Sequence, residues 1–295
     1  MSRTSARLRI LLTALLFSTG GAGIKLAHFT SWQVAGLRSG IAAIAVLFLV
    51  PAARRIESKA ALGKAALVGV AYGTTLVLFV LANKLTTSAN AIYLQAVGPV
   101  YILLLGHWLL HERITVRDLG FAAVMMLGMA CFFAGAQVAT ATAPDPGLGN
   151  ILGAVSGVTF AFLIVGLRSI GRQGGVGALA VVIGNIFAFL ATLPMALPLG
   201  SHPFSDWIVL LYLGVFQIAL SYSLLAGAIS HVPAFEASLL LLLEPVLNPV
   251  WAWLMLGERP GALAGVGGVL ILTAMLARSW WDRRAERVPE EIIAG

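Results

Sequence analysis

Ten apolar stretches, each close to twenty residues long, divide this chain of 295 residues almost from end to end. A helix needs about 20 apolar residues to cross the roughly 30 Å hydrocarbon core of a bilayer. The stretches are continuous instead of alternating between apolar and polar residues, which favours transmembrane helices over the strands of a membrane barrel. We expect spans at residues 9–27, 32–50, 65–83, 88–109, 117–135, 149–167, 176–199, 206–227, 233–256 and 261–280. The pattern therefore predicts an all-α integral membrane protein with ten transmembrane helices.

The low content of charged residues leads to the same class of protein. Charged residues make up 11% of the chain and hydrophobic residues 59%, whereas soluble domains carry about 25% charged residues. These values exclude a cytosolic enzyme, a nucleic-acid-binding domain and a disordered chain. The basic start, MSRTSARLR, precedes an apolar stretch without a clear cleavage site, so we expect a retained first helix instead of a signal peptide.

The distribution of Lys and Arg predicts the orientation in the membrane. With the N-terminus inside, the outer links hold only Lys84 and Arg259, whereas Lys25 and Arg38 lie within or near spans. Cytoplasmic loops carry an excess of Lys and Arg, so both termini are predicted to be cytoplasmic. The fifteen cations on the inner side are Arg3, Arg7, Arg9, Arg54, Arg55, Lys59, Lys64, Arg113, Arg117, Arg168, Arg172, Arg278, Arg283, Arg284 and Arg287.

The two halves of the chain resemble each other. An offset of 146 residues superposes residues 88–113, SANAIYLQAVGPVYILLLGHWLLHER, on residues 234–259, AFEASLLLLLEPVLNPVWAWLMLGER. Nearby offsets set Lys25 against Arg168 and Arg38 against Asn185. We expect a first five-helix repeat at residues 1–140, and a second at 141–295 that ends in a short cytoplasmic tail. Because five is odd, the second repeat enters the membrane with opposite polarity, an inverted-topology arrangement typical of secondary transporters.

The segments GPVYILLLGHWLLHER and EPVLNPVWAWLMLGER, which close the fourth and ninth spans, carry a family resemblance. With the 5+5 repeat, they resemble the drug/metabolite transporter (DMT) superfamily, in its branch of EamA-type ten-helix carriers. Within that branch the chain looks most like the bacterial YddG-type exporters of aromatic and other amino acids. The chain departs from symmetry at Gly98, which stands opposite Glu244 and confines any carboxylate role to one half.

The resemblance implies a secondary transporter of the bacterial inner membrane that exports neutral amino acids or related small metabolites by alternating access. It implies a small-molecule substrate and the bilayer as partners, without a cofactor or nucleic acid. The cargo could instead be drugs, nucleosides or other metabolites. An intramembrane enzyme and a non-transporting receptor are more remote alternatives.

Glu244 is the strongest candidate for a residue that acts in transport, because it lies midway along the ninth span. A charged group there is costly and should face protein or water. It could attract the ammonium of an amino acid or carry a coupling proton. Alternatively, it caps backbone groups freed by Pro245 or packs against a cation. Asn248 and Trp251 follow at i+4 and i+7 and share its face, which lines a pathway or a helix contact.

Aromatic and polar residues at helical spacing provide further candidates for a substrate pathway. Aromatic walls with a few polar groups suit an amphipathic small molecule, although such a stripe equally well packs between helices. The candidates are Tyr72, Thr75 and Phe79 in the third span, Tyr93 and Tyr101 in the fourth, Ser156 and Phe160 in the sixth, and Gln217 and Ser221 in the eighth.

Two cations and two prolines complete the set of candidates. Lys25 and Arg38 lie toward the outer ends of their spans and could bind a substrate carboxylate, or instead reach lipid headgroups and hold neighbouring helices. Pro99 and Pro245 occupy matching positions, where proline kinks a helix. They could act as hinges of alternating access or as static kinks.

Catalytic and metal sites are not indicated. The five histidines are scattered, and His107 and His111 at i, i+4 lack the HExxH pattern. Cys131 is the single cysteine, which excludes an intrachain disulfide. The chain contains no GxxxxGK[ST] motif, so we expect no nucleotide hydrolysis by that motif.

Overall fold

The computed structural model is helical throughout the residues that it describes, apart from short links and an isolated bridge between Thr140 and Ala143. The described residues are 2–54, 56, 58–98, 100–101, 115–134, 139–170, 176–228, 240–241 and 243–293. The first half contains α1 (Arg3–Ser18), α2 (Gly20–Leu26), α3 (Ser31–Leu49), the 3-10 turn η1 (Pro51–Arg54), α4 (Lys59–Leu85), α5 (Ser88–Ala96) and α7 (Val116–Ala134). The second half contains α8 (Pro146–Ile170), α9 (Val176–Ala196), α10 (Phe204–Tyr212), the π-helix η2 (Leu213–Leu220), α11 (Ser221–Ala228), α13 (Leu243–Leu256) and α14 (Ala262–Ile293).

Seven helices in the described part of the chain are long and apolar enough to cross a membrane. They coincide with seven of the ten expected spans, so the prediction of an all-α membrane protein is confirmed. A shorter apolar helix, Ala262–Ala277, covers the tenth expected span. The fourth and ninth are described only in part, by α5 and α13. The ten-helix count and the 5+5 repeat remain predictions.

The first expected span is interrupted at Thr19. The side chain and the backbone N–H of Thr19 both bond to the carbonyl of Leu16, at 2.7 and 3.3 Å, and α1 ends there. The glycines that follow in α2 allow unusually close packing. A Cβ on Gly21 would lie 2.6 Å from Oδ1 of Asn248 in α13, closer than real atoms approach. The break therefore starts a short glycine-rich helix on which α13 packs directly.

The eighth expected span contains a π-helical stretch, Leu213–Leu220, between two α-helical segments. A π-helix bonds i to i+5, and such stretches often occur at functional sites. The hydroxyl of Ser221 donates at 2.9 Å to the carbonyl of Phe216, five residues earlier. The stretch therefore changes which side chains of this span share one face.

Small residues bring α4 and α9 into close contact, as they commonly do between membrane helices. A Cβ on Gly69 would lie 2.9 Å from the carbonyl oxygen of Ala180, and one on Gly184 would lie 2.6 Å from Cδ1 of Tyr72. Glycine at these two positions therefore permits the close approach of the two helices. This contact holds Tyr72 at a fixed depth between helices of the two halves.

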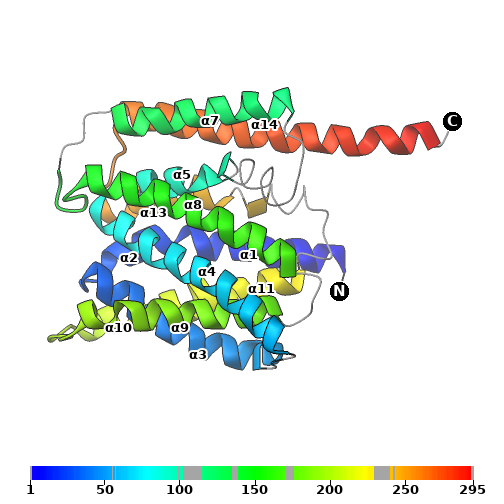
Figure 1. The fold of residues 1–295 in the computed structure, drawn as a ribbon. Helices are drawn as coiled ribbons and strands as arrows, with labels where there is room; N and C mark the ends of the chain where they lie inside the picture. Colours follow the sequence, from blue (N-terminus) through cyan, green and yellow to red (C-terminus); the bar gives the residue numbers. More distant parts are fainter. Residues whose placement is uncertain are drawn as a thin grey trace.

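Figure 1 shows the arrangement of the helices, with α7 and α14 side by side along one edge of the bundle. The start of α1 and the end of α14 lie at the same end of the molecule, here called the terminal end. The links between α2 and α3 and between α9 and α10 lie at the opposite end, here called the far end. These two ends frame the candidate site.

Candidate functional site

A buried guanidinium lies between the two halves of the chain. Arg38, on α3, is 1% exposed and lies seven residues after Ser31, roughly 10 Å into the bundle from the far end. Its Nη1 donates to Oε1 of Gln217 at 3.4 Å, and its Nη2 donates to the carbonyl of Leu76 at 3.2 Å. Its Nε has no hydrogen-bond partner among the residues that the structure describes. Within the described ranges no carboxylate lies at ion-pair distance from it.

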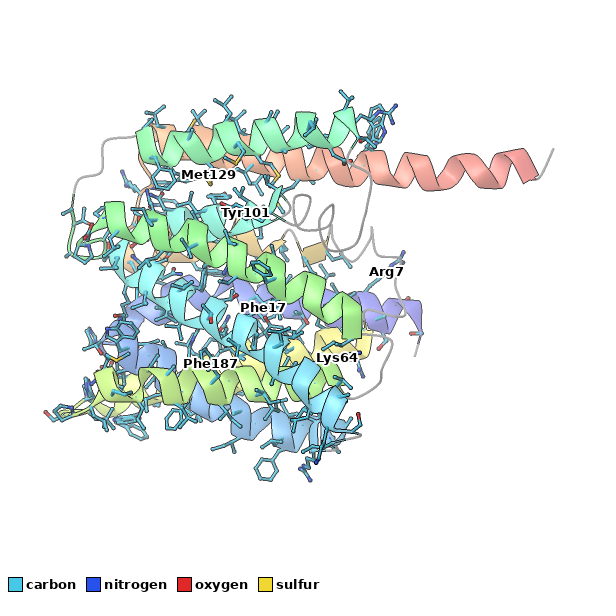
Figure 2. The ribbon with its side chains drawn as sticks, viewed as in Figure 1. Arg7, Phe17, Lys64, Tyr101, Met129 and Phe187 are labelled. Atoms are coloured by element: carbon cyan, nitrogen blue, oxygen red, sulfur yellow. The ribbon has the colours of Figure 1, made fainter. Side chains whose placement is uncertain are left out.

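Two tyrosines from different halves meet beside this guanidinium. The rings of Tyr72, on α4, and Tyr222, on α11, pack edge to face with centroids 5.2 Å apart. Phe17 also packs edge to face on Tyr222, with centroids 5.2 Å apart, and lies in the middle of the bundle in Figure 2. The buried hydroxyl of Tyr72 makes no direct hydrogen bond to the described residues, and the side chains of Asn185 and Tyr222 lie close to it. Arg38 lies within electrostatic range of both tyrosine hydroxyls.

Glu244 lies within the electrostatic neighbourhood of the same tyrosine. It lies near the start of α13, is half-buried, and is within electrostatic range of Tyr222. Among the described residues no cation forms an ion pair with it. Tyr222 therefore lies within electrostatic range of the guanidinium of Arg38 and of the carboxyl group of Glu244. We call Arg38, Tyr72, Gln217, Tyr222 and Glu244 the central cluster.

Asn248 and Trp251, which share the face of Glu244, contact α1 and α2. Asn248 is fully buried against Gly21, and both of its amide atoms lack hydrogen-bond partners. The indole Nε1 of Trp251 donates to the hydroxyl of Ser18 at 2.9 Å. From Asn248 to Trp251, this face of α13 therefore forms a helix contact with α1 and α2. Pro245 is buried beside Glu244, whereas Pro99 lies outside the described residues.

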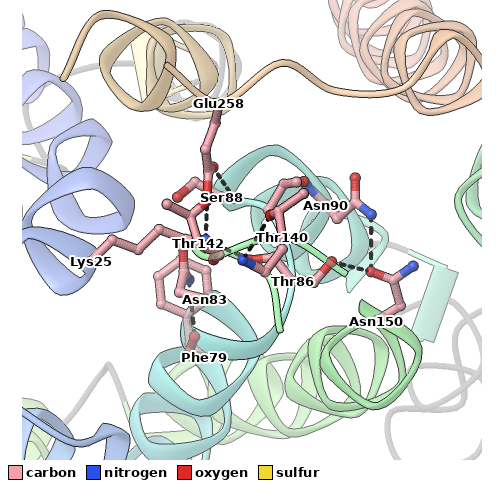
Figure 3. A network of polar contacts seen from close by, with 12 residues as sticks. Lys25, Phe79, Asn83, Thr86, Ser88, Asn90, Thr140, Thr142, Asn150 and Glu258 are labelled. Carbon is pink, nitrogen blue, oxygen red and sulfur yellow. Dashed lines mark hydrogen bonds and ion pairs between the residues drawn. The ribbon is translucent and has the colours of Figure 1, made fainter. Parts of the chain in front are cut away.

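A hydrogen-bonded ion pair lies at the far end, shown in Figure 3. The Nζ of Lys25 contacts Oε1 of Glu258 and the carbonyls of Thr86 and Thr142. The Lys25 and Glu258 side chains are 3% and 4% exposed. The second carboxylate oxygen of Glu258 accepts from the backbone N–H of Ser88 at 2.9 Å. The pair joins α2, α5, and the links that precede α8 and α14.

Asn150, on α8, extends this far-end network. Its Oδ1 accepts from the hydroxyl of Thr86 at 2.8 Å and from Nδ2 of Asn90 at 3.0 Å, and its Nδ2 donates to the carbonyl of Phe132 at 3.1 Å. These bonds tie α5, α7 and α8 together beside the ion pair. We call Lys25, Thr86, Ser88, Asn150 and Glu258 the far-end network.

Other predicted pathway residues are placed around these two groups. Thr75 donates to Thr159 at 2.9 Å, and Ser156 accepts from Gln95 at 3.2 Å, so both link α8 to the first half. The hydroxyl of Tyr101 points to Sδ of Met129 at 3.8 Å, beside α7 (Figure 2). The remaining residues make local or apolar contacts: Phe79 and Phe160 in apolar clusters, Tyr93 against Phe132, and Ser221 with its own helix.

The structure thus brings together only part of the predicted set. Tyr72, Arg38, Gln217 and Glu244 lie in the central cluster, whereas Lys25 is engaged by Glu258 at the far end. Sequence reasoning missed Tyr222. With α-helical spacing it falls outside the stripe of Gln217 and Ser221, but the π-helix brings residue i+5 onto that face. The described side chains form no group of three or more His, Cys, Asp or Glu able to hold a metal.

Known proteins share the fold and the sequence pattern of this chain. A model of the EamA-like transporter family matches residues 4–134 and again residues 147–279. An uncharacterized transporter of Clostridium kluyveri is 27% identical over 292 residues, which covers 94% of this chain and 93% of that protein. The pseudopaline exporter CntI of Pseudomonas aeruginosa is 26% identical over 284 residues, 93% of this chain and 96% of that protein.

A solved protein crystal structure has the same fold. It is 18% identical, with a TM-score of 0.64 over 97% of this chain and 100% of that chain. The match of the family model over both halves is the decisive finding. The chain belongs to the EamA-like transporter family and is a multi-pass membrane transporter.

Proposed function

We propose that the protein exports amino acids or related small metabolites across the bacterial inner membrane as a secondary transporter. The observation that carries this proposal is the central cluster. Helices of both halves contribute charged and hydroxyl groups to it, within a bundle whose described helices are predominantly apolar. Intramembrane ionisable groups mark substrate and ion pathways in membrane proteins. Aromatic walls with few polar groups suit amphipathic small molecules.

The packing of the helices supports an inverted repeat with matching halves. The repeat pairs α3 with α9 and α7 with α14, and each of these helices packs against its own counterpart. It also pairs the contact of α4 with α8 to that of α11 with α1, and both contacts are present. The two segments matched by the family model support the same division of the chain. In such carriers, exchange of the two conformations between the halves opens one end and closes the other.

The far-end network supports a role as the closed outer gate. The predicted orientation makes the far end periplasmic and the terminal end cytoplasmic, because the cations concentrate toward the termini. Lys25 and Glu258 come from opposite halves and are buried there. Release of a substrate to the periplasm requires this ion pair to separate. An inward-facing state is then the one in which Lys25 and Glu258 are paired.

Glu244 supports amino acids as the cargo. It is a carboxylate without a described cationic partner, placed beside the aromatic rings of the central cluster. A substrate ammonium would neutralise it, and a proton could replace that ammonium after release. The same residue therefore accounts for recognition of an amine and for coupling to a proton gradient.

The test is transport by the purified protein in proteoliposomes. Radiolabelled amino acids should enter loaded vesicles in a saturable manner, and a proton gradient should accelerate the flux. Flux of every amino acid no greater than in empty vesicles would overturn the proposal. The second candidate cargo is another class of metabolite, which the similarity to a pseudopaline exporter favours. Competition between labelled amino acids and a panel of unlabelled metabolites distinguishes the two candidates. Nucleosides and drugs belong in the same panel.

A further inference from the structure

We propose that Arg38 binds the carboxylate of the transported molecule, so that Arg38 and Glu244 hold opposite ends of an amino-acid group. This inference rests on the proposed function and deepens it by assigning the anion-binding residue. The charge of Arg38 is buried and has neutral partners within the described part of the chain. A buried charge is unfavourable unless it is paired or fully hydrogen-bonded.

The existing bonds leave the guanidinium incompletely satisfied. Hydrogen bonds from a cation to a carboxylate are usually about 2.7–2.9 Å long, whereas Arg38 donates at 3.4 and 3.2 Å to an amide and a carbonyl. Its Nε has no partner, and a guanidinium carries more N–H donors than these two bonds use. Arginine's planar fork is suited to bidentate contact with a carboxylate. The unused N–H donors of Arg38 therefore favour an anionic acceptor, such as a carboxylate, as its partner.

The fold itself does not require a cation at this position. The repeat sets Asn185, on α9, against Arg38. Asn185 is uncharged and fully buried, and its Nδ2 donates within its own helix to the carbonyl of Val181 at 2.9 Å. An amide therefore fills the equivalent position in the second half. The positive charge is an addition to one half only, as the carboxylate of Glu244 is to the other.

Lys25, the other predicted carboxylate-binding residue, is already engaged. Glu258 and two backbone carbonyls occupy its ammonium group at the far end. Arg38 and Glu244, by contrast, both lie within electrostatic range of Tyr222 and lack a described counter-ion. A zwitterion placed against Tyr222 would neutralise both charges at once. Its carboxylate would point toward α3 and its ammonium toward α13.

The experiment compares each amino acid with its carboxamide, which keeps the amine and loses the anionic group. Phenylalanine, phenylalaninamide, leucine and leucinamide serve as probes, with binding measured by calorimetry on purified full-length protein. Wild-type protein should bind the acids at least about tenfold more tightly than the amides, as expected for a charge-assisted bond. Arg38→Gln should reduce this ratio to about one, whereas Arg38→Lys should keep a preference for the acids. Ser39→Ala, a buried neighbour on α3, is the matched control and should retain the wild-type ratio.

The ratio is internal to each folded sample, so a loss of folded yield does not mimic the expected result. Wild-type protein that binds amides and acids equally overturns the assignment, even if Arg38→Gln does not fold. An Arg38→Gln variant that retains the preference also overturns it and assigns Arg38 to structure. In both cases the proposed function stands, because amino acids still bind. Absence of binding to either acid, together with absence of flux across the full amino-acid panel, removes the proposed function itself.

Discussion

The far-end network and the central cluster both contain buried charged groups, but only in the far-end network do the described residues pair opposite charges. Lys25 and Glu258 neutralise each other at the far end, and Asn150 makes three bonds to three other residues. In the central cluster, Arg38 and Glu244 have no counter-ions among the described residues. The difference agrees with the proposal that the centre receives a charged molecule, whereas the ion pair at the far end holds helices together.

We expect the largest loss of stability when one member of the Lys25–Glu258 ion pair is removed. Lys25→Met leaves the buried carboxylate of Glu258 without its cation and should reduce stability by about 3–5 kcal/mol. Thermal unfolding in detergent, followed by fluorescence-detected gel filtration, measures the effect. The double variant Lys25→Met with Glu258→Gln should recover most of the loss. A double variant no more stable than the single one would contradict the buried pairing.

Disruption of the contact between Gly184 and the ring of Tyr72 should cause the next largest loss of stability. A Cβ on Gly184 would lie 2.6 Å from the ring of Tyr72, so Gly184→Ala should reduce stability by about 1–3 kcal/mol through overpacking. Gly63→Ala is the matched control, because a Cβ there meets nothing within 4 Å. Gly63→Ala should stabilise α4 by roughly 0.5–1 kcal/mol. Equal effects of the two variants in thermal unfolding would argue against the close α4–α9 contact.

Substitution of two asparagines, Asn150 in the far-end network and Asn185 beside Tyr72, compares how much each region contributes to stability. Asn150→Ala removes bonds to α5, α7 and the link after α4, and should cost about 1–3 kcal/mol. Asn185→Ala removes one bond within its own helix and a contact with the hydroxyl of Tyr72, and should cost less. Unfolding curves of the two variants, recorded under the same conditions, test the order. The reverse order would show that the far end contributes less to stability than the hydrogen bonds suggest.

Glu244→Gln should have the smallest effect on folded yield and a large effect on transport. The carboxylate has no described ion-pair partner to lose, so its removal should change stability by less than about 1 kcal/mol. Flux per folded molecule in proteoliposomes should fall about tenfold or more, the loss of one charged contact to the substrate. Unchanged flux would assign Glu244 to structure.

The sequence predicted the positions of the helices better than it predicted the side-chain contacts between them. Apolar stretches of membrane length, and glycines such as Gly69, are local signals that determine a span or a close contact directly. The pairing of Lys25 with Glu258 joins residues 233 positions apart. No local pattern specifies it. The sequence indicated Lys25 as a candidate without identifying Glu258 as its partner.

The central cluster was predictable in its composition and not in its geometry. Glu244, Arg38 and Gln217 are polar residues in apolar spans, which makes each of them visible in the sequence. Tyr222 was missed because an α-helical period was assumed through a segment that is π-helical. The interruption at Thr19 escaped prediction for a related reason, since a hydroxyl that caps α1 resembles any other polar residue within an apolar stretch.

The π-helix also limits how the chain can change in length. Deletion of a single residue between Leu213 and Leu220 would allow the segment to relax to ordinary α-helical bonding and would preserve its hydrophobicity. An α-helix turns the chain by roughly 100° per residue and a π-helix by less, so the seven remaining residues would cover about the same rotation as the eight π-helical ones. Such a deletion would keep Tyr222 against Tyr72 and Phe17, whereas insertion of a further residue would rotate Tyr222 away from them. In relatives that keep this tyrosine pair, we expect single-residue deletions within Leu213–Leu220 to be tolerated far more readily than single-residue insertions.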